Sequence, residues 1–232
     1  MTSYLFDAPE VFAIPVKGES ADYPVRRIFC VGRNYAAHAA EMGGEVDREA
    51  PWYFTKSACH GVLSGATRPY PPGTENYHHE MELAFAIGRP VFRATPEEAE
   101  AAIYAYGCAL DMTRRDRQQD GKDKRRPWDL GKDVEGSAVF GDMSRAEEFG
   151  PVGAQRIHLE VNGESRQDAT LEELVWSCEE VVMHLSKFYH LAPGDVVMTG
   201  TPAGVGPVVA GDKITGGVDG LAPISLNIDP AE

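Results

Sequence analysis

Two glutamates two positions apart have the residue type and spacing of metal ligands. Glu80 and Glu82 begin the segment 80–87, in which polar or small residues alternate with large apolar ones as they do in a β-strand. The two carboxylates therefore share one face of the predicted strand. Neighbouring negative charges are costly to bury unless a positive group lies between them, and a hard divalent cation is one such group. A half-exposed strand with two solvated glutamates is the alternative.

A third carboxylate ends another predicted strand. The run 103–110 is apolar and predicts a buried strand, and Asp111 follows it directly. Because a carboxylate can face a site inside the fold where a strand leaves the core, Asp111 is a candidate third ligand beside Glu80 and Glu82. A role as a turn or cap residue is the alternative.

A histidine and a glutamate three residues apart lie in a short predicted helix, for which Asn34 is a candidate N-cap and Gly43 a candidate end. At this spacing Glu41 can hydrogen-bond one imidazole nitrogen of His38 and leave the other as a proton acceptor, which is how a general base is oriented. Two solvated side chains on a surface helix are the alternative. The helix has about two turns, so it is marginal alone, and ordering over a bound substrate would make it a lid.

A basic segment follows Asp111 in an otherwise acidic chain. Residues 113–132 hold eight basic and four acidic residues, whereas the whole chain has a formal net charge of -14. Such a segment can attract an anionic substrate through the surrounding negative field. A solvated basic helix is the alternative.

The overall composition excludes several classes of partner. The 232 residues are 43% hydrophobic, which is enough for one domain with a full core. The negative charge argues against nucleic acid and against an anionic membrane. No apolar run approaches the length of a membrane span, and the first residues resemble neither a signal nor a transit peptide, so we expect a cytoplasmic protein. The four cysteines form no Cys-x-x-Cys pair and are expected to be reduced and mostly buried.

The elements that must position these residues are predicted from local patterns. Residues 1–24 hold short apolar segments between turn-forming residues and predict a small N-terminal β appendage, followed by a main domain over 25–232. Short apolar runs between glycines and prolines in the second half predict many short strands and tight turns. Apolar residues near helical spacing predict a helix over 170–190.

A glycine-rich loop spans residues 200–207. It matches neither the Walker A motif nor the dinucleotide-binding pattern, but it can present backbone amides and the Thr201 hydroxyl to a carboxylate. The chain contains no Gly-x-Ser-x-Gly motif, which argues against a serine hydrolase.

In combination, these motifs are similar to those of the fumarylacetoacetate hydrolase family in its short bacterial form. They run in family order across roughly residues 30–206, and a C-terminal stretch extends the match. The matching stretches are Val31–Tyr35 with His38 and Glu41, Glu80–Glu82, Leu110–Thr113 with Arg115, Asp116 and Gln118, Gly131–Lys132, Thr199–Pro202 with Gly204–Gly206, and Gly216–Leu221.

The resemblance implies an α+β, β-rich fold, the mixed β-roll of this family with a few peripheral helices, usually assembled as a homodimer. It implies Mg²⁺ or Mn²⁺ as cofactor, bound by Glu80, Glu82 and Asp111. An all-oxygen site suits a hard divalent ion, and three carboxylates leave about three octahedral positions for a chelating 1,3-diketo acid.

The resemblance also implies that the domain over 25–232 hydrolyses a carbon-carbon bond in an acylpyruvate, a small anionic keto acid. In this hypothesis the Glu41–His38 pair deprotonates the attacking water, and Lys132 and Gln118 stabilise the negative charge that develops on the leaving group. The residues expected to bind the substrate's carboxylates are Arg33, Arg115 and Thr201.

Several stretches most resemble the family members that cleave fumarylpyruvate to fumarate and pyruvate in aromatic (gentisate) degradation. The chain departs from them at Lys56–Cys59, where relatives commonly have Lys-Pro followed by Asp, and at Val139, where proline is frequent. Both departures touch predicted pocket walls and so bear on the substrate. The alternatives are a short-chain acylpyruvase or an oxaloacetate decarboxylase or tautomerase, and, in a different class, a non-catalytic small-acid-binding protein.

Overall fold

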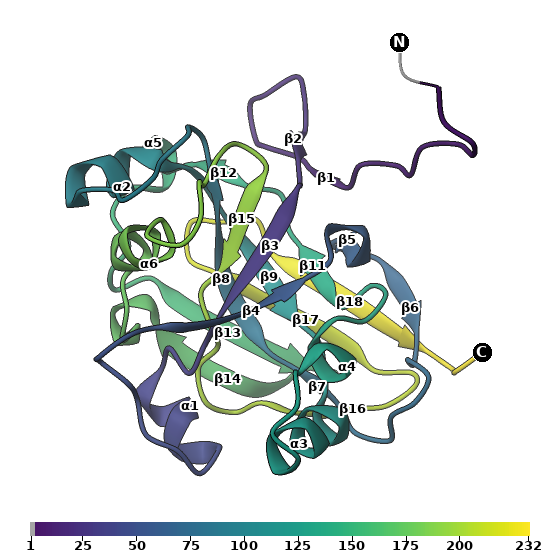
Figure 1. Ribbon diagram of the computed structural model, residues 1–232. Coiled ribbons are helices and arrows are strands. Elements are labelled where there is room, and N and C mark those ends of the chain that lie inside the picture. The colour runs from purple at the N-terminus through teal and green to yellow at the C-terminus, as the bar shows by residue number, and fades with distance from the viewer. Residues whose placement is uncertain (1–2) are drawn as a thin grey trace.

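The computed structural model describes residues 3–232 and consists mainly of short strands with a few short helices (Figure 1). The expectation about a signal peptide concerned the first residues of the chain, of which Met1 and Thr2 lie outside the described residues. Among residues 3–232, no helix combines the length and the apolar character needed to span a membrane. All four cysteines are free thiols, and every one except the exposed Cys59 is buried.

The largest sheet has eight strands in the order β4-β3-β15-β8-β9-β11-β5, with β12 paired to β9. Its strands are β3 (Arg27–Gly32), β4 (Trp52–Lys56), β5 (Gly61–Leu63), β8 (Met81–Ile87), β9 (Ile103–Asp111), β11 (Ala138–Phe140), β12 (Ser144–Arg145) and β15 (Asp195–Met198). A five-stranded sheet has the order β14-β13-β17-β18-β6. Its strands are β6 (Thr67–Pro69), β13 (Arg156–Val161), β14 (Glu164–Thr170), β17 (Lys213–Val218) and β18 (Ile224–Asp229).

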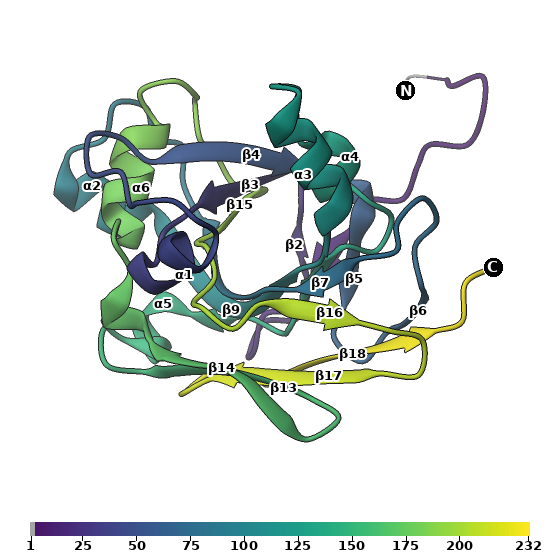
Figure 2. The ribbon, with the colours of Figure 1, turned by 90° about the horizontal axis from the view of Figure 1, so that it is seen from below.

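Two smaller sheets complete the strand structure. A three-stranded sheet has the order β10-β7-β16, and β1 pairs with β2 at the N-terminus. These strands are β1 (Ala13–Ile14), β2 (Tyr23–Pro24), β7 (Tyr77–His79), β10 (Thr113–Arg114) and β16 (Gly206–Val208). In the view of Figure 2, the five-stranded sheet lies below and β3, β4 and β15 lie above, so the strands curl into a roll.

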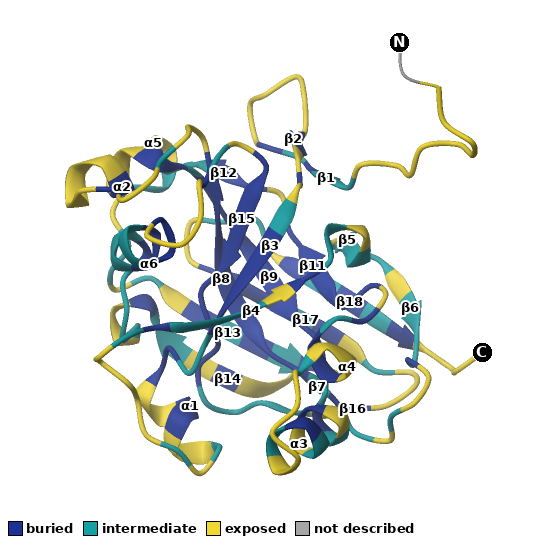
Figure 3. Ribbon diagram, viewed as in Figure 1, coloured by how far each residue is buried: buried dark blue, intermediate teal, exposed yellow. Residues whose placement is uncertain are grey.

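The helices are short and peripheral. They are α1 (Ala36–Glu41), α2 (Pro96–Ala102), α3 (Arg115–Asp123), α4 (Asp129–Lys132), α5 (Ala146–Phe149) and α6 (Cys178–Leu185), with 3₁₀ turns at η1 (Ala58–His60) and η2 (Leu171–Glu173). Figure 3 shows that α2 and α3 have exposed outer faces, whereas the central strands are buried.

The predicted helix over 170–190 is wrong in its extent. The chain forms only η2 and the eight-residue α6 there, because Ser177 and Glu180 form a capping box that starts α6 at Cys178. The intervening residues are not helical: Leu174 forms an isolated bridge with Tyr35, and the Val175 N–H donates to the Asn34 carbonyl oxygen at 2.8 Å. Asn34 is also not the N-cap of α1, because its amide side chain instead bonds both backbone groups of Trp176 and the carbonyl of Thr199.

Strand β8 is buried on both faces, which excludes a half-exposed strand. Its large apolar side chains enter one core cluster with Leu110 and Leu159. Its alanines face a second cluster, to which the N-terminal Ile14 and Tyr23 contribute. Ile14 and Tyr23 therefore pack on the large sheet, and the predicted domain boundary after residue 24 stays a prediction.

Candidate active site

Three carboxylates lie together where β8 and β9 meet. The strands are antiparallel, with Glu82 opposite Ala109, and the Asp111 N–H donates to the Glu80 carbonyl oxygen at 2.9 Å. This register puts the three side chains on one face. Each offers an oxygen within 4.8 Å of the others, and Glu80, Glu82 and Asp111 are only 4%, 2% and 0% exposed. The alternatives of solvated glutamates and of a turn or cap role for Asp111 do not describe this arrangement.

Two cations from the predicted basic segment neutralise one side of this cluster. The Lys132 ammonium lies 2.7 Å from Glu80 Oε2, 2.6 Å from Asp111 Oδ2 and 2.7 Å from Thr113 Oγ1. The Arg115 guanidinium donates to Glu80 Oε1 and, at 2.7 Å, to Gln118 Oε1. Arg115 therefore contacts Glu80 and Gln118, and its expected role in binding the substrate's carboxylates stays a prediction.

The close approach of α3 and α4 brings these cations together. At Gly131 a Cβ atom would lie 2.7 Å from the backbone nitrogen of Gln118, which is closer than real side chains approach. Glycine at this position therefore lets α4 pack directly on α3. The consequence is that Lys132 and Gln118 face the same cavity.

The carboxylates differ in how well they are compensated. Burial alone would raise the pKa of Glu80, but Lys132 and Arg115 hold this pKa well below its usual range. Burial, Asp111 and Glu80 raise the pKa of Glu82 well above its usual range. Glu82 accepts one hydrogen bond, from the Gly200 N–H at 2.8 Å. Positive charge is therefore lacking on the Glu82 side of the cluster.

The free acceptors fit a hard divalent cation. Lys56 Nζ lies 2.9 Å from Asp111 Oδ1, but its three protons are used by the carbonyls of Met112 and Lys132 and by Ser137 Oγ. Asp111 Oδ1 accordingly has no hydrogen bond among residues 3–232. A carboxylate oxygen of Asp111 that accepts no hydrogen bond, beside a Glu82 carboxylate that lacks a compensating cation, fits the oxygen ligands that Mg²⁺ or Mn²⁺ prefers.

The predicted base pair is assembled at the same cavity. His38 Nδ1 lies 3.2 Å from Glu41 Oε2, and His38 is 7% exposed. Because an ionised carboxylate only accepts hydrogen bonds, Nδ1 carries the proton and Nε2 is left as an acceptor. Burial lowers the pKa of His38, although Glu80 and Glu41 oppose this effect. The imidazole is therefore neutral at neutral pH.

The glycine-rich loop holds Glu41 in place. The Gly204 N–H lies 3.1 Å from Glu41 Oε1 and 3.2 Å from Oε2. Gly204 has φ +97°, and a Cβ atom there would collide with the Arg166 carbonyl oxygen. Thr201 lies in the same loop, and its Oγ1 accepts a hydrogen bond from Gln167 Nε2 at 2.8 Å.

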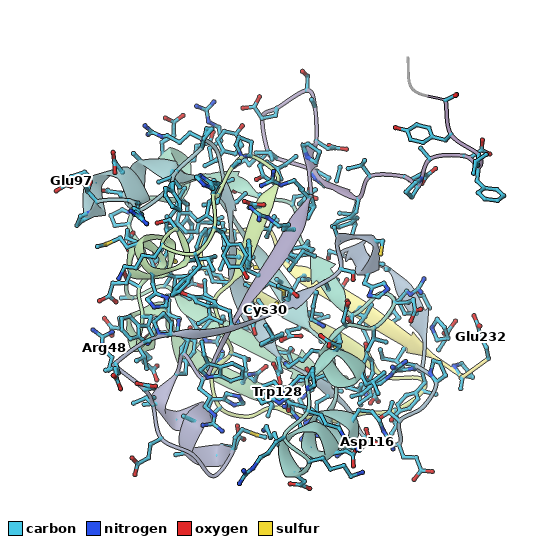
Figure 4. The ribbon with its side chains drawn as sticks, in the orientation of Figure 1. Cys30, Arg48, Glu97, Asp116, Trp128 and Glu232 are labelled. Carbon is cyan, nitrogen blue, oxygen red and sulfur yellow. The ribbon has the colours of Figure 1, made fainter. Side chains whose placement is uncertain are left out.

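These residues line one cavity. Every residue predicted from the sequence as catalytic, metal-binding or substrate-binding lines it except Glu41, which contacts His38 from behind. Sequence reasoning assigned no site role to Lys122 or to the aromatic wall of Trp52, Phe54 and Trp128, which line the cavity, or to Lys56, which pairs with Asp111. Figure 4 shows Trp128, which lies on the α4 side of β4. A lysine seven residues after Arg115 on one helix was the available signal for Lys122.

The chain is similar to a known protein family and to several of its members. A family model described as fumarylacetoacetate (FAA) hydrolase C-terminal matches residues 27–228. A fumarylpyruvate hydrolase of a Ralstonia species is 52% identical over 194 residues, which are 82% of this chain and 100% of the relative. Oxaloacetate tautomerase YcgM of Escherichia coli (strain K12) is 40% identical over 207 residues, 88% of this chain and 93% of the relative.

A solved structure is also closely similar. The crystal structure of fumarylpyruvate hydrolase from Pseudomonas aeruginosa in complex with Mn²⁺ and pyruvate superposes with a TM-score of 0.93 at 42% identity. The match covers 98% of this chain and 100% of that chain. The expected β-rich roll with peripheral helices is thereby confirmed.

Proposed function

The chain belongs to the fumarylacetoacetate hydrolase family, and from this premise we propose that it is a metal-dependent enzyme that hydrolyses fumarylpyruvate to fumarate and pyruvate. The observation that carries the proposal is the meeting of a buried three-carboxylate cluster and an oriented His38–Glu41 pair at one cavity. The relatives named as fumarylpyruvate hydrolases support the choice of substrate.

Glu80, Glu82 and Asp111 are the residues proposed to hold Mg²⁺ or Mn²⁺. When bound, such an ion supplies Lewis-acid polarisation of the substrate's keto oxygens. Lys132 keeps its proton, because Asp111 and Glu80 raise its pKa against the effect of burial. It therefore acts as a fixed positive charge rather than as a base.

His38 is the proposed general base. Its Nε2 accepts a proton from water while Glu41 stabilises the imidazolium through Nδ1. The water oxygen bonds to the acyl carbonyl carbon, and the bond between that carbon and the neighbouring methylene carbon breaks. The electron pair goes to the pyruvate portion, whose methylene carbon then takes a proton to become a methyl group. Lys132 and Gln118 face the region where the negative charge develops.

The decisive assay follows the loss of fumarylpyruvate by its enol absorbance, with Mg²⁺, with Mn²⁺ and after chelation. We expect metal-dependent cleavage that produces equal amounts of fumarate and pyruvate. A short acylpyruvate and oxaloacetate are measured beside it. Turnover of only one of these would reassign the substrate, and no turnover with either metal would favour the non-catalytic binding protein.

A second candidate function is oxaloacetate tautomerisation, or decarboxylation at the same site. The observation in its favour is the 40% identity to a relative with the tautomerase name. That chemistry uses an enolate near Lys132 but requires no attacking water. Comparing kcat/KM for fumarylpyruvate and oxaloacetate separates the two candidates.

Further properties are inferred with this function. We expect the enzyme to be cytoplasmic. We also expect it to use neither nucleic acid nor a membrane as partner, because its formal net charge is -14. We also expect a homodimer. Light scattering after size-exclusion chromatography measures the oligomeric state, and a monomer at assay concentration would contradict this expectation.

A further inference from the structure

Two cations of the cavity are not used by the carboxylate cluster. Arg115 and Lys132 pair with Glu80, whereas, among residues 3–232, Arg33 and Lys122 form no ion pair. Both line the cavity and both are half-buried. Positive side chains of this kind, turned inward without a partner, have unused capacity to bind an anion.

Helix α3 places Lys122 at a distance from the carboxylates. Arg115, Gln118 and Lys122 all line the cavity and are spaced i, i+3 and i+7, which puts them on one stripe of the helix. Seven residues correspond to about 10 Å along the helix axis. Because Arg115 contacts Glu80, this stripe leads from the carboxylate cluster outward to Lys122.

Arg33 lines the same cavity from the end of β3. Arg33 follows directly after the last residue of β3, with φ +55°, a conformation that is uncommon for a residue with a Cβ atom. Its guanidinium lies against Gly44, where a Cβ atom would be 3.0 Å from Nη1. A side chain at position 44 would push this guanidinium away.

The two cations influence one another. Burial, Arg115 and Arg33 lower the pKa of Lys122 to about 8. Mutual repulsion among cations beside a cavity is relieved when an anion binds between them. The repulsion therefore supports an anionic ligand rather than a neutral one.

Aromatic rings form the wall beside Lys122. Its ammonium lies 5.1 Å from the centre of the Trp128 ring, and Trp128 packs edge-on against Trp52 with ring centres 4.6 Å apart. Trp52 in turn lies over Gly32, where any side chain would collide with its indole. A flat apolar wall of this kind fits a planar, conjugated acyl chain better than a polar, strongly hydrated chain.

We propose that Arg33 and Lys122 form a subsite for a carboxylate at the far end of the acyl chain, so that the enzyme selects acylpyruvates whose acyl group ends in a carboxylate. The inference rests on the proposed acylpyruvate hydrolysis and adds a specificity-determining pair to it. The aromatic wall lies along the conjugated portion, and the carboxylate cluster takes the dioxo end.

Two matched substrates test this subsite. Fumarylpyruvate and crotonylpyruvate have the same trans acyl chain, but crotonylpyruvate has a methyl group in place of the distal carboxylate. We expect the wild type to prefer fumarylpyruvate in kcat/KM. Lys122→Met should lower kcat/KM for fumarylpyruvate roughly tenfold or more, mainly through KM, because a charge-assisted hydrogen bond is lost. The value for crotonylpyruvate should stay within about twofold, because the substitution removes no contact to a methyl group.

Control variants distinguish the subsite from a general charge effect. Lys124→Met makes the same charge change just after α3, on an exposed residue paired with Asp120, and should leave both substrates unchanged. Lys122→Arg should restore much of the preference for fumarylpyruvate. Unfolding temperatures of all variants check that the fold is intact.

The outcomes separate this inference from the proposed function. If the wild type cleaves both substrates equally well, or if Lys122→Met lowers both by the same factor, the hydrolase assignment stands and the subsite is wrong. If the wild type cleaves neither substrate with Mg²⁺ or Mn²⁺, the proposed function fails, and the subsite fails with it.

Discussion

Among the three carboxylates of the cluster, Glu82 has the weakest compensation of its charge by neighbouring groups. Glu80 contacts two cations, whereas Glu82 has a single backbone N–H as hydrogen-bond donor. Burial of such a group disfavours its charged form, which is why its pKa is raised. A divalent cation removes this penalty, so metal binding and stability should be linked through this residue.

Thermal unfolding with and without Mn²⁺ tests this link. Mn²⁺ should raise the Tm of the wild type, because a ligand that binds only the folded state stabilises it by about 2.7 kcal/mol at a hundredfold excess over Kd. Glu82→Gln should raise the Tm of the metal-free protein, because a neutral amide replaces a buried carboxylate, and should reduce the Mn²⁺ shift. Glu97→Gln on α2, far from the site in Figure 4, is the control. An equal Mn²⁺ shift in Glu82→Gln and the wild type would exclude Glu82 as a ligand.

Removing the imidazole of His38 tests its role as the base. His38→Gln should lower kcat for fumarylpyruvate by about 10²- to 10⁴-fold, the usual contribution of a positioned general base. Oxaloacetate decarboxylation, which needs no attacking water, should be retained. Glu41→Gln should cause a smaller loss, because it only orients the ring. If His38→Gln changes neither reaction, His38 is not the base.

The pH dependence of fumarylpyruvate cleavage follows from the lowered pKa of His38. Because the folded-state pKa lies below the ordinary value of 6.5, the neutral and active form of the imidazole persists below that pH. We therefore expect the acid limb of kcat/KM to have its midpoint below pH 6.5. An acid limb with its midpoint above pH 6.5 would contradict the buried, neutral His38.

At the scale of elements, the contact between α1 and the glycine-rich loop orients the base pair. Glu41 contacts His38 within α1 and, outside α1, the Gly204 N–H. Without the loop, α1 has only six residues and no side-chain cap, and so little stability of its own. Whether α1 moves as a lid stays a prediction, but its position depends on this contact.

Gly204→Ala should therefore affect catalysis as well as stability. Position 204 combines a left-handed φ with a collision between the new Cβ and the Arg166 carbonyl, so the loop must shift and the N–H must leave Glu41. We expect a lower kcat for fumarylpyruvate. Gly211→Ala is the matched control, because Gly211 has φ +94° but open space around a Cβ. It should cost about 1–2 kcal/mol of stability and leave kcat unchanged. Equal kcat losses in both variants would show that strain, not the Glu41 contact, is responsible.

At the scale of the whole molecule, the N-terminal segment is attached to the main sheet through Tyr23. Its hydroxyl donates to the carbonyl oxygens of Ile87 at 2.8 Å and Asp195 at 3.1 Å, and accepts from the Gly194 N–H at 2.6 Å. Burial raises the pKa of Tyr23 well above its usual range, so the hydroxyl keeps its proton. The segment therefore completes the core that covers the second face of β8.

Tyr23→Phe tests whether this segment is part of one cooperative unit. The substitution leaves buried backbone groups unpaired and should lower the free energy of unfolding by about 1–3 kcal/mol. Urea unfolding should remain a single transition with a lower midpoint. Tyr189→Phe, at a position that is 43% exposed, should change little. A separate early transition in Tyr23→Phe would instead support residues 1–24 as an independent appendage.

Local spacing indicated candidate reactive groups, and the family resemblance assigned their roles. The alternation after Glu80 puts two carboxylates on one face, the strand end supplies Asp111, and three residues separate His38 from Glu41. These relations hold in any fold that keeps the local element, and the family motifs then indicate how the elements assemble. The β-roll was predicted from the order of these family motifs along the chain.

Contacts between distant parts of the chain decided the rest. The alanine face of strand β8 is buried in a cluster to which residues distant in sequence, such as Ile14 and Phe140, contribute. Helix α6 begins only at Cys178, and the residues before it are bound to Asn34 instead of continuing the helix. Lys56 and Lys122 carry no local signature of a site, since a lysine near an aromatic strand or on a basic helix is usually solvated. Their positions beside the cavity, and hence its charge balance, follow from packing between elements, which the periodicity along one element does not describe.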